Sequence, residues 1–264
     1  MLLADSGRFA YAGTSFSHSL RPYAHLTHAH NTLRIDLKQQ QTKPPLATAA
    51  VSNHSWNFQP SFYIVQGNQG LWDGLEGTAC HSRSVYYQRG EWLVVVDAID
   101  SDRGKRTVQA TWHGHPNVSL SNFSTSGGDV AFILGGVDGH TGSPTEAQVA
   151  IIPAGGDAAM QWNAGVSVIE GVPPNSSDET QGWYSASYSD AQASPVLVYN
   201  AQLASDQKQA TFAWLLVTSA TSDIATPTKA EIVVTAVNNT AVDLSVTVGG
   251  AAPKAITVPV QRCA

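Results

Sequence analysis

The chain has 264 residues, a formal net charge of −6 at pH 7 and a charged fraction of 13%, which is about half the usual share. Its hydrophobic fraction of 42% is close to that of globular proteins and excludes wholesale disorder. Nucleic-acid binders are usually basic, and no apolar run approaches the roughly 20 residues of a membrane span. We therefore expect a globular protein with no nucleic-acid partner and no membrane span.

The N-terminal stretch differs in charge from the rest of the chain. Residues 1–45 hold five lysine or arginine side chains and two acidic ones, so this stretch is basic within an acidic chain. Such a stretch could meet an anionic ligand. It lacks the basic segment and the long apolar run of a signal peptide.

Four of the nine histidines lie close together, at His18, His25, His28 and His30. In a strand, residues i and i+2 point to the same face. His28 and His30 would then emerge side by side, with Arg34 further along that face. Two such imidazoles can supply two zinc ligands, or one ligand and one proton-transfer group. The alternative is a pair of partly exposed histidines on a sheet.

Strand signals dominate the remaining residues. Segments 84–87 and 92–97 flank a turn and predict a hairpin, in which Asp97 ends its strand as a turn or capping residue. Segments 231–237 and 242–248 predict a second hairpin. Further strands are predicted at 108–113, 130–134, 148–152, 196–199 and 212–217.

No window of 12 residues has helical periodicity. We therefore predict an all-β fold, a multi-stranded antiparallel β-sandwich of stacked sheets. We place the sandwich at residues 1–220 and a smaller C-terminal β-sheet, packed on the same unit, at residues 221–264. Cys80 and Cys263 could pair, but two cysteines alone do not establish a disulfide.

Several short motifs follow one another in a recognisable order. They are Asp5-Ser6-Gly7-Arg8-Phe9-Ala10-Tyr11, Leu20-Arg21-Pro22-Tyr23, His30-Asn31-Thr32-Leu33-Arg34-Ile35-Asp36, Gly70-Leu71-Trp72-Asp73-Gly74-Leu75, His81-Ser82-Arg83-Ser84-Val85 and Trp92-Leu93-Val94-Val95-Val96-Asp97. Over most of residues 2–220 the chain resembles the β-sheet region of the heparinase II/III-like polysaccharide lyases. The resemblance implies a two-part enzyme, an N-terminal α/α toroid followed by stacked β-sheets. Such an enzyme cleaves uronate-containing polysaccharides, such as heparin, heparan sulfate or alginate, by β-elimination.

The resemblance also implies roles for individual residues. His28 matches a histidine of the catalytic cleft, His30 matches a metal ligand, and His81 of the His-x-Arg motif matches a second ligand. The family's third ligand is an Asp between these two, but residues 41–56 contain no Asp, and His54 or Asn53 could take its place. The expected cofactor is Zn²⁺, with Ca²⁺ as the weaker alternative.

Three further residues are candidates for substrate binding. Arg21 could hold an acidic sugar, and Tyr23 matches the family's Arg-x-Tyr step but could equally belong to the core. Trp72 lies near glycine-rich loops, where an indole can stack on a sugar ring.

The family's other catalytic residues lie on the toroid, which this chain does not contain. We therefore expect a polysaccharide lyase only if the chain is joined to a toroid, in cis or as a separate chain, with an acidic polysaccharide as partner. The resemblance implies an extracellular or periplasmic location. The alternatives are a non-catalytic carbohydrate-binding or structural β-sandwich and, more weakly, a zinc hydrolase, which lacks an acidic base beside the His-x-His pair.

Overall fold

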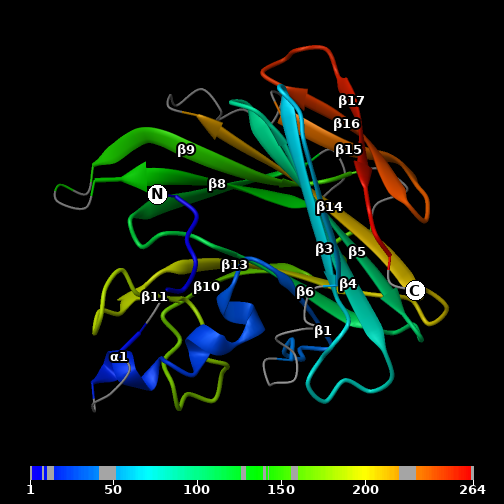
Figure 1. The fold of residues 1–264 in the computed structure, drawn as a ribbon. Coiled ribbons are helices and arrows are strands. Elements are labelled where there is room, and N and C mark those ends of the chain that lie inside the picture. Colours follow the sequence, from blue (N-terminus) through cyan, green and yellow to red (C-terminus); the bar gives the residue numbers. More distant parts are fainter. Residues whose placement is uncertain are drawn as a thin grey trace.

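The computed structural model describes residues 2–262 apart from residues 8, 11–14, 42–51, 126–128, 139–140, 142, 156–159 and 220–229. Nearly all regular structure in this part of the chain is β-strand (Figure 1). Every pairing between its named strands is antiparallel. The predicted all-β sandwich is confirmed.

An eight-stranded sheet forms the main layer. Its strands are, in spatial order, β2 (Ser52–Phe58), β3 (Phe62–Gln69), β4 (Ala79–Gln88), β5 (Trp92–Ser101), β14 (Gln209–Ser219), β9 (Pro144–Pro153), β8 (Val130–Val137) and β7 (Val118–Ser124). The hairpin predicted around residues 88–91 is confirmed as β4–β5, and both of its strands extend beyond the predicted bounds. β14 is buried along most of its length, as expected for a central strand with neighbours on both sides.

A four-stranded sheet packs on one face of this layer. Its strands are, in spatial order, β1 (Leu33–Ile35), β6 (Thr107–His113), β13 (Pro195–Gln202) and β10 (Val166–Glu170). Side chains of both sheets share one apolar core. At its centre the rings of Trp112 and Trp214 meet edge to face at 5.5 Å, and Tyr199 lies 4.8 Å from Trp214.

A three-stranded sheet covers the other face. It comprises β15 (Ala230–Val237), β16 (Ala241–Val248) and β17 (Lys254–Pro259), drawn in orange and red beside β3–β5 in Figure 1. The second predicted hairpin is confirmed as β15–β16. The Ser84 hydroxyl donates a 2.6 Å hydrogen bond to the Pro259 carbonyl. The predicted domain boundary at 220/221 falls outside the described residues and stays a prediction.

The remaining elements are short. They are α1 (Phe16–Ser19), the 3₁₀ helices η1 (Tyr23–His25) and η2 (Thr27–Ala29), and the strand pair β11 (Trp183–Tyr184) and β12 (Gln192–Ala193). No helix in the described part of the chain is long and apolar enough to cross a bilayer. Cys80 forms a disulfide, whereas Cys263 lies outside the described residues, so their pairing stays a prediction.

Candidate functional site

Arg34 is the centre of a buried polar cluster. It is the middle residue of β1, opposite Gln109 of β6. Its Nε donates a 2.8 Å hydrogen bond to Gln109 Oε1, and only 3% of its side chain is exposed. This bond fixes the plane of the guanidinium and directs its two terminal nitrogens away from the sheet.

Those two nitrogens bind the carboxylate of Glu179. Arg34 Nη1 donates to Glu179 Oε1 at 2.8 Å, and Arg34 Nη2 donates to Glu179 Oε2. Burial alone would raise the pKa of Glu179, but the hydrogen bond from Arg34 and the charge interactions with His28 and Arg34 together outweigh it and lower the pKa. Glu179 is therefore an ionised carboxylate, with 44% of its side chain open to solvent.

His28 lies beneath this ion pair. Its Nε2 donates to the Thr180 carbonyl at 3.0 Å. Its Nδ1 accepts from Arg34 Nη1 at 3.3 Å and from Gln39 Nε2 at 3.4 Å, and it lies 3.5 Å from Glu179 Oε1. Burial, together with the charge of Arg34, lowers the pKa of His28. This assigns a neutral imidazole with its proton on Nε2 and its lone pair on Nδ1, facing Arg34.

Tyr23 packs against His28 from the other side. The two rings lie 5.6 Å apart, and Tyr23 belongs to a small apolar cluster with Phe9, Leu20 and Ala29. Burial raises the pKa of the Tyr23 hydroxyl, so the phenol is neutral at ordinary pH. The structure thus places Tyr23 within reach of the histidine but inside the core.

His113 and Asn31 hold the His28 segment in place. His113 Nε2 donates to the His28 carbonyl at 3.0 Å, and burial lowers the pKa of His113 to about 4. The Asn31 side chain accepts from the His113 backbone N–H at 2.6 Å and donates to the Ala4 carbonyl at 2.9 Å. The segment is therefore fixed between the N-terminal residues and β6.

His30 turns away from this cluster. Its Nδ1 lies 2.7 Å from Asp5 Oδ2, and both side chains are about half-exposed. The hydrogen bond with Asp5 raises the pKa of His30. The prediction that His28 and His30 share a strand face is wrong, because residues 27–29 form a 3₁₀ turn and β1 begins only at Leu33.

His81 belongs to a second buried charge cluster. Its Nε2 lies 2.7 Å from Asp97 Oδ1, and Arg83 binds both carboxylate oxygens of Asp97 through Nε and Nη2. Burial alone would raise the pKa of Asp97, but the Arg83 charge and the His81 hydrogen bond hold it well below its usual range. The interpretation of Asp97 as a turn or capping residue is wrong, because it lies fully buried inside β5.

The predicted zinc ligands do not come together. His54 and His81 line one cavity of about 410 Å³, whereas His30 pairs with Asp5. Nowhere in the described ranges do three His, Cys, Asp or Glu side chains gather as metal ligands would. Residues 42–51 contain none of these residue types. The side chains that the structure describes therefore do not form a complete zinc site, and zinc binding stays a prediction.

The predicted substrate-binding residues lie in different surroundings. Trp72 is buried, and its Nε1 donates to the Ala79 carbonyl at 2.9 Å, so little of its ring is left for a sugar. Arg21 instead lines a cavity of about 450 Å³ together with His18 and His25. These three basic side chains follow one another at spacings of three and four residues, which places them on one side of the α1–η1 turn.

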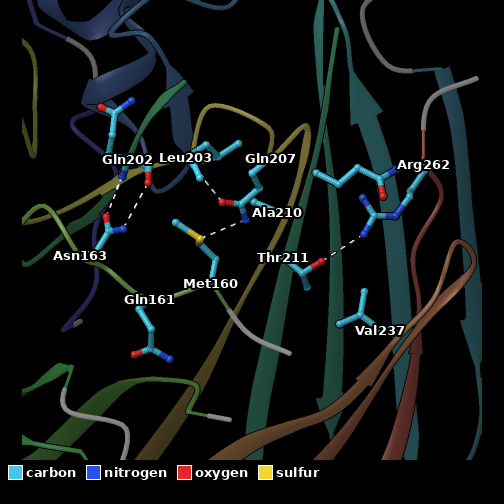
Figure 2. Close-up of a pocket in the computed structure, with 12 residues that line it drawn as sticks. Met160, Gln161, Asn163, Gln202, Leu203, Gln207, Ala210, Thr211, Val237 and Arg262 are labelled. Carbon is cyan, nitrogen blue, oxygen red and sulfur yellow. Dashed lines mark hydrogen bonds between the residues drawn. The ribbon is translucent and has the colours of Figure 1, made fainter. Parts of the chain in front are cut away.

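Another cavity, of about 780 Å³, lies at the C-terminal end of β13, where Gln202 is part of its lining (Figure 2). Its polar groups bind one another: Asn163 with the Gln202 backbone, Gln207 with Met160 Sδ, and Arg262 with Thr211. None of the predicted site residues lines it, and its lining includes no Asp, Glu, His or Tyr. It therefore offers no group suited to proton transfer near neutral pH.

The sequence did not reveal the carboxylates that lie beside His28 and His30. Glu179 lies 145 residues from Arg34, and no local pattern links the two. Asp5 stands in the first recognised motif, but nothing in that motif indicates that it binds His30. Only the contact between Arg34 and His28 had a signal in the sequence, because these two residues are six positions apart.

The sequence matches the family described as "Heparinase II/III-like, C-terminal" over residues 1–215. Among solved structures, a heparinase III gene product aligns with a TM-score of 0.69 and 17% identity, covering 97% of this chain and 34% of that one. The heparan sulfate lyase HepC from Pedobacter heparinus aligns with a TM-score of 0.68 and 15% identity, covering 100% of this chain and 35% of that one. The chain thus spans about a third of the length of these structures. No curated protein sequence matches it.

Proposed function

Because the chain belongs to the heparinase II/III-like C-terminal family, we propose that it is the β-sheet part of a polysaccharide lyase that acts on uronate-containing polysaccharides, heparin-, heparan sulfate- or alginate-like. One structural observation supports the proposed chemistry. A neutral imidazole, His28, lies directly beside a guanidinium, Arg34, that already binds a carboxylate.

β-Elimination makes specific demands on such a site. The C5 proton, next to the uronate carboxylate, is removed, the bond from C4 to the leaving oxygen breaks, and a C4–C5 double bond forms. The leaving oxygen then takes a proton. Neutralising the carboxylate stabilises the charge that develops when the C5 proton departs.

Arg34 is suited to neutralise that carboxylate. In this proposal a uronate carboxylate takes the place of Glu179 on the same guanidinium, which now binds Glu179 through two nitrogens. Glu179 then leaves Arg34 when substrate binds. The exposed half of the Glu179 side chain gives it room to do so.

His28 is suited to take a proton beside that position. Its neutral state and its Nδ1 lone pair, 3.3 Å from Arg34 Nη1, put a base next to the carboxylate-binding group. Arg21, with His18 and His25 around one cavity, would hold a neighbouring acidic sugar. Tyr23 supports the His28 ring by packing against it.

The chain supplies only part of the proposed enzyme. We propose that an N-terminal α/α toroid, in cis or as a separate chain, contributes the remaining catalytic groups, and that the complete lyase works in the periplasm or outside the cell. The length of the aligned structures, about three times that of the aligned region, supports a further part.

A second candidate is a non-catalytic carbohydrate-binding or structural module. The closure of the His28 cluster favours it, because the His28 side chain has no exposed surface in this chain. Under this alternative, the contacts of His28 with Arg34 and Thr180 serve stability only.

The test is a lyase assay that follows the ultraviolet absorbance of the unsaturated uronate product. The chain is assayed alone and joined to an α/α toroid, with His28→Ala, Arg34→Gln and, as a control outside the cluster, His115→Ala. We expect product only with the toroid, a loss of about 100-fold or more in the first two variants, and no change in the control. Retention on immobilised polysaccharide without product from any form would favour the second candidate.

A further inference from the structure

An aromatic face lies open at the β2 edge of the eight-stranded sheet. Trp56 is 62% exposed, Phe58 is 60% exposed, and the adjacent Val65 is 49% exposed. Scattered apolar side chains on a surface are ordinary, but a contiguous group of large ones marks a binding surface.

The strand register gathers these side chains. Along β2, His54, Trp56 and Phe58 alternate and therefore point to one face. Phe58 pairs with Tyr63 of β3, which pairs with Tyr87 of β4. The rings of Phe58 and Tyr63 lie 5.1 Å apart, and those of Tyr63 and Tyr87 lie 6.2 Å apart.

Trp56 begins a second cross-strand row, next to the row of Phe58, Tyr63 and Tyr87. Trp56 pairs with Val65, which pairs with Val85 of β4. The indole of Trp56 stacks on the His54 ring at 5.9 Å. Two residues along a strand span about 6.6 Å, so Trp56 and Phe58 present their rings about one sugar unit apart.

The aromatic face is exposed because the core shared with the four-stranded sheet ends before it reaches β3 and β2. The same side of β5 carries Val95 and Ile99, which are buried in the core shared with the four-stranded sheet. Val85 on β4 is half-buried at the border of that core. On the same side of the sheet, side-chain exposure then rises from Val85 on β4 to Val65 on β3 and Trp56 on β2.

A cavity of about 410 Å³, whose exposed lining is mostly apolar, adjoins the aromatic face. Its lining includes His54 and Val65 of the face, together with Thr32, Gln40, Gln69 and Arg83, and none of its eleven lining residues is acidic. Outside the cavity, the Arg89 guanidinium lies 5.2 Å from the centre of the Tyr63 ring. Histidine and arginine side chains thus border both the cavity and the rings.

We infer that the aromatic face and the adjoining cavity bind an acidic oligosaccharide. The C–H faces of sugar rings pack on Trp56 and Phe58. The mostly apolar lining of the cavity packs on the carbon atoms of a neighbouring sugar ring. Arg89 and His54 attract the carboxylate or sulfate groups, and the absence of acidic side chains from the cavity lining avoids repulsion.

One residue of the cavity lining is hydrogen-bonded to the segment that carries His28. Gln40, which lines the cavity, donates its backbone N–H to Thr27 Oγ1 at 2.7 Å, and the next residue along the chain is His28. The inference takes its ligand class from the proposed function, but it does not require catalysis.

The test measures binding by titration calorimetry with heparin- and alginate-derived octasaccharides, and with cellohexaose as the neutral probe. We expect the acidic probes to bind the chain, and Trp56→Ala and Phe58→Ala to weaken binding about tenfold each. Val168→Ala, an exposed apolar position on edge strand β10 of the other sheet, is the matched control and should leave binding unchanged. All three positions are exposed, so the melting temperatures should stay close to that of the parent chain.

Three results would overturn the inference. They are unchanged binding of the acidic probes in both aromatic variants, equal affinity for cellohexaose, and a monomer–dimer equilibrium that is lost in Trp56→Ala. The last would identify a second copy of the chain as the occupant. Tenfold weaker binding in Trp56→Ala together with no lyase product from any form would sustain this inference and reject the catalytic one.

Discussion

The His28 cluster and the aromatic face of β2–β4 are both candidate binding surfaces, but they are built in opposite ways. At the cluster, every ring nitrogen of His28 and every nitrogen of the Arg34 guanidinium has a partner within the chain. On the face, Trp56 and Phe58 contact neighbouring rings and are otherwise open.

The difference shows what each region needs in order to act. Buried charges are stable only while they are paired, so the cluster must exchange one partner for a ligand. The aromatic rings lose only water when a ligand arrives. The face is therefore ready to bind, whereas the cluster must first release Glu179.

The largest effect is expected at the Asp97 cluster of the β4–β5 hairpin, whose His81 and Arg83 line the cavity beside the aromatic face. Asp97→Ala leaves Arg83 and His81 without their shared carboxylate, and we expect a loss of about 3–5 kcal/mol of unfolding free energy. Asp5→Ala, which removes a half-exposed partner of His30, should cost less than about 1 kcal/mol. Urea denaturation measures both, and similar losses would contradict the distinction between buried and exposed pairs.

The second effect is the pH dependence of the closed cluster. Burial lowers the pKa values of His28 and His113 below 6.5, so these residues bind fewer protons when folded. Their contribution to stability is complete above pH 6.5 and is lost as the pH falls, by about 3 kcal/mol for His113 if its pKa is about 4.

Denaturation at pH 7 and pH 4.5 tests this, with His113→Gln expected to flatten the profile. His30 acts in the opposite direction. Its raised pKa means that its contribution is complete below pH 6.5 and is lost as the pH rises through the higher value. If the unfolding free energy of His113→Gln falls between pH 7 and pH 4.5 as much as that of the parent chain, His113 does not cause the loss.

A smaller effect is expected from opening the cluster. Glu179→Ala removes the carboxylate that occupies Arg34, and we expect binding of acidic oligosaccharides to strengthen several-fold while stability falls by about 1–3 kcal/mol, because Arg34 is buried and Glu179 is half-exposed. Glu170→Ala is a control at a nearby acidic position. Weaker or unchanged binding in Glu179→Ala would mean that ligand does not reach Arg34.

The smallest effect concerns metal. His30 pairs with Asp5, and among the described residues His54 and His81 line the cavity without a third His, Cys, Asp or Glu ligand. Removing metal with EDTA should therefore lower the melting temperature by less than about 2 °C. A larger fall that Zn²⁺ reverses, and that His81→Ala abolishes, would establish the zinc site predicted from the sequence.

The sequence predicted the sheets better than the site. Alternation and buried runs located β5, β13 and β14, because strand periodicity is a local signal. The orientation of His28 was missed because a 3₁₀ turn rotates it relative to His30. Glu179 could not have been found, since it lies in the connection between β10 and β11, and its bond to Arg34 depends on how that connection packs against β1.

The pairing of β5 with β14 has a consequence for how the molecule forms. The paired residues Asp100 and Gln209 lie 109 residues apart, so the middle of the main sheet closes only after most of the chain has been made. Long loop closures of this kind slow folding. Until β14 arrives, β5 presents an unpaired apolar edge, and the nascent chain is then most exposed to aggregation.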